Sequence, residues 1–161
     1  MSNRPNRQCP LVARNIRAYT RIVMIDRPSE PCTCSALRRA TRAVTTIYDE
    51  ALRPCGLRVT QFAILRLLDR LGPSPVTRLA AEAALERTTM GRNLDPLERR
   101  GLVRIEAGEA DARARVVSLT DAGRAALAAA IPHWRVAQAR INARIEPAAV
   151  AALTEALTAA P

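Results

Sequence analysis

Residues 76–120 of the 161-residue chain read VTRLAAEAALERTTMGRNLDPLERRGLVRIEAGEADARARVVSLT, and this stretch decides the fold. Its first half contains two segments with apolar residues at helical spacing, separated by the turn Ala84-Leu85-Glu86. Its second half contains LVRIE and RVVSL, which alternate apolar and polar residues as β-strands do, around the long tip AGEADARA. The order helix, turn, helix and β-hairpin is that of a winged helix-turn-helix, a unit that reads DNA.

The first helix of the pair is expected within VTRLAAEAAL. Leu79, Ala80 and Ala83 share one face of it, and Thr77 is expected to cap its free amide groups. The second helix is expected from about Arg87 to Arg100. Residues at i, i+4 and i+7 give this second helix one apolar stripe facing a core, and they are Met90, Leu94 and Leu97.

Two residues bear on where the second helix ends. Gly101 accepts the left-handed conformation that closes a helix, so the helix is expected to stop at or near Arg100. Pro96 lies inside the expected range, lacks an amide donor and crowds the carbonyl of Arg92. The sequence therefore predicts either a kink at Pro96 or a shortened helix.

The face opposite the apolar stripe is polar and basic. It carries, with its flanks, Thr88, Thr89, Arg92, Asn93 and Arg99. Hydroxyl, amide and guanidinium groups are the groups that read base edges and phosphates in a major groove. The hairpin tip holds Asp111 and Arg113, and an arginine on an extended loop can enter a narrow minor groove. Helices and wing together favour DNA binding over a merely solvated charge pattern on a small α+β domain.

These residues resemble the winged helix-turn-helix of MarR-type bacterial transcriptional regulators. The resemblance covers roughly residues 34–160, and its most specific parts are ERTTMGRNLDPLERRGLV, the wing segment DARAR and the following LTDAG. It implies a set of DNA-contacting residues, in the major groove from the second helix and in the minor groove from the wing. They are Arg87, Thr88, Thr89, Arg92 and Asn93 on the helix, with Asp111 and Arg113 on the wing. Arg115, which follows them on the wing, is a further candidate for DNA contact.

Helical patterns flank this unit on both sides. One helix is expected from Cys34 to about Arg53, and a second from Thr60 to Leu71, with apolar residues inward. After the wing, Thr120 is expected to cap a helix that Pro132 interrupts or bends. Pro147 starts a final short helix that reaches about Ala159.

The sequence therefore predicts a mainly α fold with a small β-hairpin wing, in which a winged helix-turn-helix is joined to N- and C-terminal dimerisation helices. The expected segments are a basic tail at 1–31, a dimerisation helix at 32–56, the DNA-binding domain at 57–120 and further dimerisation helices at 121–161. The terminal helices are apolar on more than one side, so a partner is expected. A twofold homodimer would place two recognition helices about one DNA turn apart, on a palindromic operator. The resemblance implies that the first and last helices form the dimer interface.

The charge of the chain is consistent with a polyanionic partner. Its net charge is +10, its isoelectric point is about 11.2 and all its basic residues except His133 are arginines. Residues 57–120 hold eleven arginines against eight acids, whereas residues 1–56 hold ten against four, so much of the excess lies outside the wing region. No apolar run is long enough to span a bilayer, and a cytoplasmic protein with no membrane partner is expected.

The first 31 residues form a basic, proline-punctuated tail, in which five arginines precede the first acid, Asp26. Three explanations stay open. The tail can be an arm that grips nucleic acid, it can be an organellar-type presequence, or the start codon can be Met24.

Four cysteines, Cys9, Cys32, Cys34 and Cys55, precede the wing region and offer a second hypothesis. Cys34 lies at the expected start of a helix, whose positive end stabilises a thiolate. In the MarR branch that senses organic hydroperoxides, a reactive cysteine occupies a similar place, and Tyr48 stands at the spacing of its supporting tyrosine. That resemblance is partial, because a second supporting tyrosine would fall at Val59. Cys32 is one of several candidate resolving thiols.

The resemblance also implies a pocket for a small aromatic or phenolic effector between the dimerisation helices and the DNA-binding domain. Phe62, His133 and Trp134 are its candidate lining residues, but for Trp134 a role as an anchor of the dimer interface is favoured. Neither a metal nor a cofactor is predicted, because Cys32 and Cys34 are too close for ordinary zinc spacing and His133 is the sole histidine.

Enzymatic functions lack their sequence motifs, since the chain has no GxGxxG, Walker or GxSxG segment and no second histidine for a triad. The sequence predicts a homodimeric repressor whose operator affinity falls when a small molecule or an oxidant reshapes the dimer. Two alternatives remain. One is a DNA-binding protein without an inducer, and the other is a thiol-based, peroxide-reacting protein without specific DNA reading.

Overall fold

A computed structural model describes residues 32–108 and 114–159 of the chain. The basic tail at 1–31 and the wing residues Asp111 and Arg113 lie outside the described residues. The chain divides into two compact units, Met1–Ala40 and Thr41–Pro161. Helix α2 (Thr33–Leu52) begins in the first unit and ends in the second, and all the other described elements belong to the second.

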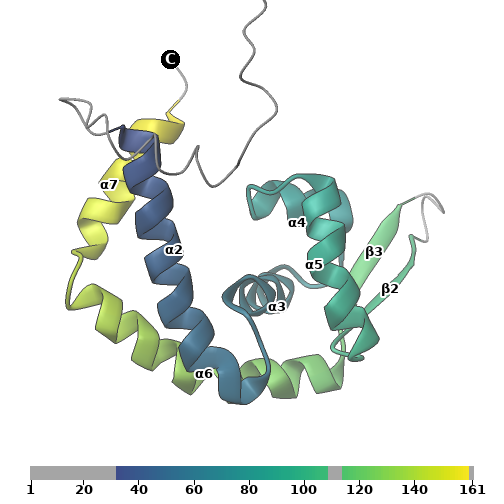
Figure 1. Cartoon of the computed structure of the whole chain (residues 1–161). Helices are drawn as coiled ribbons and strands as arrows, with labels where there is room; N and C mark the ends of the chain where they lie inside the picture. The colour runs from purple at the N-terminus through teal and green to yellow at the C-terminus, as the bar shows by residue number, and fades with distance from the viewer. Residues whose placement is uncertain (1–31, 109–113, 160–161) are drawn as a thin grey trace, which may run out of the picture. The chain divides into compact units, whose positions relative to one another are not determined.

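The helical elements agree closely with the expected ones (Figure 1). The helix predicted to end at Pro54-Cys55-Gly56 does so through the 3₁₀ turn η1 (Arg53–Cys55), which Gly56 closes with a φ of 64°. The remaining elements are α3 (Val59–Leu71), β1 (Ser74–Pro75), α4 (Val76–Glu82), α5 (Arg87–Arg99), β2 (Val103–Ala107), β3 (Arg115–Leu119), α6 (Asp121–Asn142) and α7 (Pro147–Thr158).

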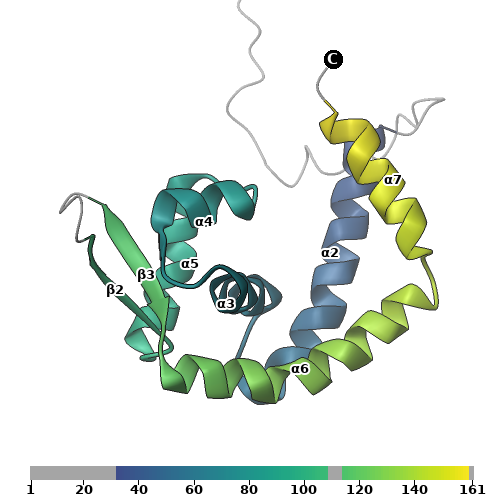
Figure 2. The same cartoon turned by 180° about the vertical axis from the view of Figure 1, so that it is seen from behind.

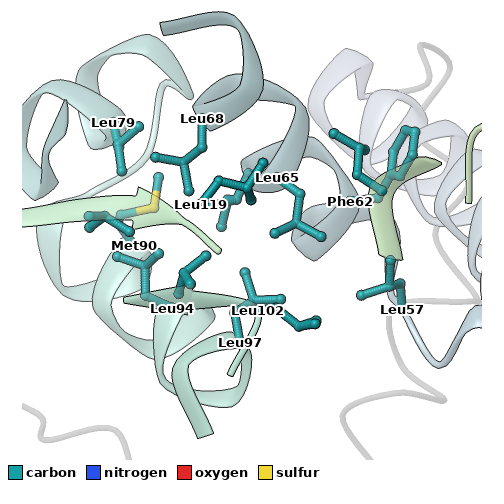
Figure 3. Packing of buried hydrophobic residues seen from close by; sticks show 14 of the residues in the cluster. Leu57, Phe62, Leu65, Leu68, Leu79, Met90, Leu94, Leu97, Leu102 and Leu119 are labelled. Carbon is teal, nitrogen blue, oxygen red and sulfur yellow. The ribbon is translucent and has the colours of Figure 1, made fainter. Parts of the chain in front are cut away.

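One hydrophobic core holds α3, α4, α5 and the sheet together. The predicted stripe of α5 is confirmed, because Met90, Leu94 and Leu97 are at most 1% exposed. Figure 3 shows their side chains gathered with those of Leu68 on α3 and Leu79 on α4. Burying these side chains stabilises the unit by roughly 1.5–3 kcal/mol each, and it also fixes which face of α5 points outward.

The predicted hairpin is confirmed, and the structure adds a third strand. β2 and β3 pair antiparallel, with Val103 opposite Leu119 and Ile105 opposite Val117. The added strand, β1, consists of two residues that pair with the other edge of β3, so the strand order is β1-β3-β2. Sequence patterns miss β1 because two residues show no alternation, and its pairing partners lie more than 40 positions away.

The ends of the helices contain one wrong and one confirmed prediction. Thr77 does not cap α4, because the helix already begins at Val76, and the N-cap position falls on Pro75. Thr120 does cap α6, since its Oγ1 accepts from the amide of Gly123 at 3.0 Å. Gly123 itself allows a close approach, because a Cβ there would lie 2.0 Å from the carbonyl oxygen of Leu102.

The two internal prolines leave their helices continuous. α5 runs through Pro96 to Arg99, so the helix is not shortened. α6 runs through Pro132 as one helix of 22 residues, and Figures 1 and 2 show it bending along its course. Buried residues lie on both sides of Pro132, among them Leu127 and Ala137. Packing on both sides therefore offsets the backbone hydrogen bond that the proline removes.

The C-terminal helices expose apolar side chains. The exposed large hydrophobic residues on these helices and the loop between them are Val136, Ile145, Val150, Leu153 and Leu157, at 40–67%. None of the twelve residues of α7, all of which the structure describes, is buried. Among the described residues, no helix combines the length and the apolar character that crossing a membrane requires.

Candidate DNA-binding surface

Helix α5 is the second helix of the helix-turn-helix, and it is called the recognition helix. A tight turn sets it at a fixed angle to α4. Ala84 adopts a left-handed conformation with a φ of 49°, and the amide of Leu85 donates to the carbonyl of Ala80 at 2.9 Å. The turn ends at Glu86, the extended N-cap residue of α5. This short connection fixes the direction in which α5 leaves the core, as a helix-turn-helix requires.

Burial of the apolar stripe turns the polar face of α5 outward. Arg87, Thr88, Thr89 and Arg92 are all exposed, and they occupy the first two turns of the helix. Asn93 is partly buried, and its amide nitrogen donates to the carbonyl of Thr89 at 2.9 Å. Because that bond uses one of two amide hydrogens, the other hydrogen and the carbonyl oxygen of Asn93 remain available to a base edge.

The fold also brings Arg115 of the wing to the recognition helix. Arg87 and Arg115 line one small hollow of about 90 Å³ between α5 and the sheet, together with Asp95. The two arginines are 28 positions apart in the sequence, and no sequence pattern predicts their meeting. Two arginines that line one hollow give it a positive charge suited to a phosphate, while Asp95 limits the net charge there.

The C-terminal end of α5 is firmly closed. The amide of Gly101 donates to Glu98 at 2.8 Å and that of Leu102 donates to Leu97 at 3.0 Å, which is the pairing of a Schellman cap. The hydroxyl of Thr120 donates to the carbonyl of Gly101 at 2.7 Å. This bond links the end of the recognition helix directly to the start of α6.

The structure places the candidate effector residues at the contact of α3 and α6. The rings of Phe62 and Trp134 stack with centroids 5.9 Å apart, and the guanidinium of Arg66 covers Trp134 at 4.6 Å from its ring centroid. His133 is exposed. Trp134 therefore packs within its own chain, against the buried Phe62. A hollow of about 470 Å³ lies between the same two helices, lined by Ala63, Arg66, Leu67, Asp69, Arg70, Leu127 and Ile131.

The candidate redox residues differ in their surroundings. Cys32 and Cys34 are both exposed, and α2 begins between them, at Thr33. Hydrogen bonds from the backbone amide and the hydroxyl of Ser35 lower the pKa of the Cys32 thiol. Tyr48 donates its hydroxyl to Oε1 of Gln138 at 2.6 Å, and partial burial raises the pKa of this phenol. The hydroxyl of Tyr48 is thus already bonded to α6.

Comparisons with known proteins agree on one family. Residues 57–114 match the model of the MarR family. The chain is 42% identical to the transcriptional regulator MosR of M. tuberculosis, solved in complex with DNA, with a TM-score of 0.70 over 79% of this chain and 96% of MosR. It is 30% identical to the transcriptional repressor CouR bound to a 23-mer DNA duplex, with a TM-score of 0.68 over 78% of this chain and 89% of CouR.

A third structure shows a relative with a small molecule. CouR from Rhodococcus jostii RHA1, bound to p-coumaroyl-CoA, is 27% identical, with a TM-score of 0.63 over 76% of this chain and 86% of that one. The matches extend well beyond the winged helix-turn-helix, since they cover more than three quarters of the chain. The winged helix-turn-helix, its outward polar face and these matches lead to one conclusion. The chain belongs to the MarR family of DNA-binding transcriptional regulators.

Proposed function

We propose that the protein is a homodimeric repressor that binds a palindromic operator and is released from it by a small molecule. The observation that carries this proposal is the outward polar face of α5. The helix is fixed in this orientation because its apolar residues Met90, Leu94 and Leu97 are at most 1% exposed. A helix fixed in this way presents the same groups to every operator it meets. Pre-organised groups lose little entropy on binding, and this favours specific recognition.

The proposed DNA contacts come from α5 and the wing. Arg87, Thr88, Thr89, Arg92 and Asn93 would enter the major groove, with Arg92 the strongest candidate for a bidentate contact to guanine. Arg115 would hold a backbone phosphate beside Arg87, because both line the same hollow. Asp111 and Arg113 are proposed for the minor groove. Residues 57–120 would thus form the DNA-binding domain.

The dimer is proposed from the apolar surface that one chain leaves uncovered. MarR regulators are dimers. Here Val150, Leu153 and Leu157 repeat along α7 and are 46–63% exposed. Segments 32–56 and 121–161 would form the interface, and a twofold axis between them would present two copies of α5 to successive major grooves.

The proposed effector is a small aromatic or phenolic molecule. CouR was solved with p-coumaroyl-CoA, which carries a phenolic ring. In this chain, Arg66 lines the hollow between α3 and α6 and also lies over the stacked rings of Phe62 and Trp134. His133, which precedes Trp134 on α6, is exposed. The apolar residues Leu127 and Ile131 of the hollow suit a ring, and Arg66 suits an anionic group. An effector there would act by favouring a spacing of the two α5 helices that no longer fits the operator.

A second candidate trigger is oxidation of thiols at the start of α2. The observation that favours it is the lowered pKa of Cys32, which increases the thiolate fraction at neutral pH. A thiolate attacks an organic hydroperoxide to give a sulfenic acid and an alcohol. A peroxide-reacting protein without specific DNA reading is not favoured, because the chain matches regulators solved on DNA along most of its length.

A single experiment tests the proposed function and separates its triggers. The purified protein is titrated against its own upstream DNA with excess competitor, first reduced and then after stoichiometric organic peroxide. Competitor-resistant binding in both states supports an effector-released repressor without a thiol trigger. Binding lost only on oxidation assigns the trigger to thiols, and Cys32→Ser and Cys34→Ser then identify which one. Binding that competitor removes in both states contradicts the proposal.

The protein would act by binding alone, and it needs no catalytic residue, metal or cofactor for this role. Repression also requires access to DNA, which is consistent with a cytoplasmic location.

A further inference from the structure

The side chain of Arg100 joins the end of α5 to the turn that follows α2. Arg100 is the C-cap residue of α5. Its Nη1 donates to the carbonyl of Gly56 at 2.7 Å and its Nη2 donates to the carbonyl of Cys55 at 3.5 Å. Cys55 ends η1 and Gly56 follows it, so one side chain bridges two elements 44 residues apart.

The two carbonyls are well suited to a guanidinium. They lie at the end of a helical turn, where carbonyl groups lack partners within the helix and carry partial negative charge. Gly56 is left-handed, with a φ of 64°, and its own amide donates back to Arg53 at 2.9 Å. Its missing side chain matters too, since a Cβ there would lie 3.4 Å from Nη2 of Arg100. The guanidinium therefore lies directly against the glycine backbone.

Two further contacts hold the junction between α2 and α3, which contains Cys55 and Gly56. Asp49 on α2 accepts from the first amide of α3, that of Val59, at 2.8 Å. The thiol of Cys55 donates to the carbonyl of Ala129 on α6 at 3.8 Å. The junction thus joins the ends of α2 and α3 to the middle of α6, and Arg100 adds the recognition helix to it.

We propose that Arg100 is a positioning residue of operator recognition. It fixes the tilt of α5 relative to the C-terminal end of α2. This inference rests on the proposed function, in which α2 helps to form the dimer. α5 has 13 residues and is about 20 Å long. A tilt of about 5° at one end therefore moves the other end by nearly 2 Å, more than a hydrogen bond to a base edge tolerates. The buried stripe holds α5 along one side, and Arg100 holds its end.

A positioning role predicts an effect on half-site spacing. The operator is compared with versions in which the two half-sites are one base pair closer or one base pair further apart. Wild-type protein should prefer the native spacing. Arg100→Ala should reduce that preference roughly three- to tenfold, the consequence of losing about one net hydrogen bond. Arg100→Lys keeps the charge and one donor direction, so it should recover part of the preference.

A phosphate contact by Arg100 predicts a different result. Loss of a phosphate contact lowers the slope of log affinity against log salt by about 0.9, whereas loss of a positioning residue leaves that slope unchanged. Arg99→Ala is the control for charge, because it removes the same charge from the same helical turn. Arg99 lies on the polar face of α5, so its loss can weaken binding equally at every spacing. The Arg99→Ala variant should keep the wild-type spacing preference.

Three outcomes overturn the inference. The first is an Arg100→Ala protein with the wild-type spacing preference, and the second is a salt slope reduced by about one phosphate with spacing preference intact. The third is an equal loss of spacing preference in Arg99→Ala. Thermal unfolding of each variant shows whether the fold is retained. If Arg100→Ala is unstable, Arg100→Lys gives the test, because it should still lose part of the wild-type spacing preference. Wild-type protein without competitor-resistant binding contradicts the proposed function itself, and the inference with it.

Discussion

Helices α5 and α7 are of similar length, with 13 and 12 residues, but their apolar side chains differ in burial. The apolar stripe of α5 is at most 1% exposed and lies in a core made by its own chain. The apolar residues Val150, Leu153 and Leu157 of α7 are 46–63% exposed. A single chain therefore covers the apolar side of α5, whereas it leaves the apolar residues of α7 exposed, and we propose that a second chain covers them.

The comparison divides the protein's properties between two kinds of contact. Contacts within the chain should determine the stability of the winged helix-turn-helix and the direction of α5. Contacts between chains should determine how two such helices are spaced on DNA. Changes on one side of this division should therefore leave the other side measurably intact.

The largest expected effect comes from opening the core beneath α5. Leu97→Ala removes a side chain that is 0% exposed and should cost about 2–5 kcal/mol in the free energy of unfolding, because a cavity is left. Urea denaturation followed by circular dichroism measures it. Arg99→Ala, two residues further along the same helix and exposed, is the control and should change stability by less than about 0.5 kcal/mol. Equal losses of stability in the two variants would contradict the claim that the buried side of α5 stabilises the domain.

The second effect should fall on the dimer alone. The double variant Leu153→Asp and Leu157→Asp puts charges on the exposed face of α7, where a partner would bury them. We expect monomers in sedimentation experiments, an unchanged circular dichroism spectrum and operator binding weakened by about 100-fold or more, or about 2.7 kcal/mol. Ala148→Asp with Ala152→Asp adds the same charge to the opposite face of α7 and should preserve the dimer. A dimeric Leu153/Leu157 variant contradicts the proposed interface.

Much of this fold follows from local signals in the sequence. The stripe of α5, the closing Gly101 and the cap at Thr120 are each set by residues within a few positions, so the sequence predicts them correctly. The wrong cap at Thr77 arises because Thr77 lies one residue inside a helix that begins after Pro75. Contacts between distant segments leave no such local pattern. β1 paired with β3, Tyr48 bonded to Gln138 and Arg100 bonded to Gly56 are visible only in the structure.

Some features of the proposed DNA-binding face are predictable from local sequence and others are not. The outward side of α5 is predictable from helical periodicity, because burying one side of a helix exposes the other. The meeting of Arg87 with Arg115 is not, because it depends on the wing folding back against α5. The effector residues show the same limit, since stacking of Phe62 on Trp134 joins α3 to α6.

A third, smaller effect sharpens the role of the exposed face of α5. Arg92→Ala should cost roughly 1–3 kcal/mol in operator affinity if Arg92 reads a base, and it should leave stability unchanged because Arg92 is exposed. Fluorescence anisotropy on the operator and on single-base variants measures the loss and its position. Affinity equal to wild type on every sequence would remove Arg92 from the proposed contacts.

A still smaller effect should come from the link between α5 and α6. Thr120→Ala removes both the cap on Gly123 and the hydrogen bond to Gly101, and it should cost about 1 kcal/mol of stability. Thr120→Ser keeps both hydrogen bonds and serves as the control in the same urea titration. A stability loss in the serine variant as large as in the alanine variant would contradict the assigned bonds.

The smallest effect is expected at the wing. Arg113→Ala should weaken operator binding and reduce the salt slope by about one phosphate-equivalent or less. Anisotropy titrations at several salt concentrations measure the slope. A slope equal to that of the wild type, at unchanged affinity, would exclude Arg113 from the DNA contacts.

Two copies of α5 are proposed to read one palindromic site, and the pattern of protection on the DNA shows whether they do. Hydroxyl-radical footprinting of the protein on its own upstream DNA locates the protected bases at single-nucleotide resolution. Two bound copies of α5 should protect two half-sites related by a dyad. The centres of these half-sites should be about one helical turn, roughly 10–10.5 base pairs, apart. A single protected half-site, or protection without a dyad, would contradict it.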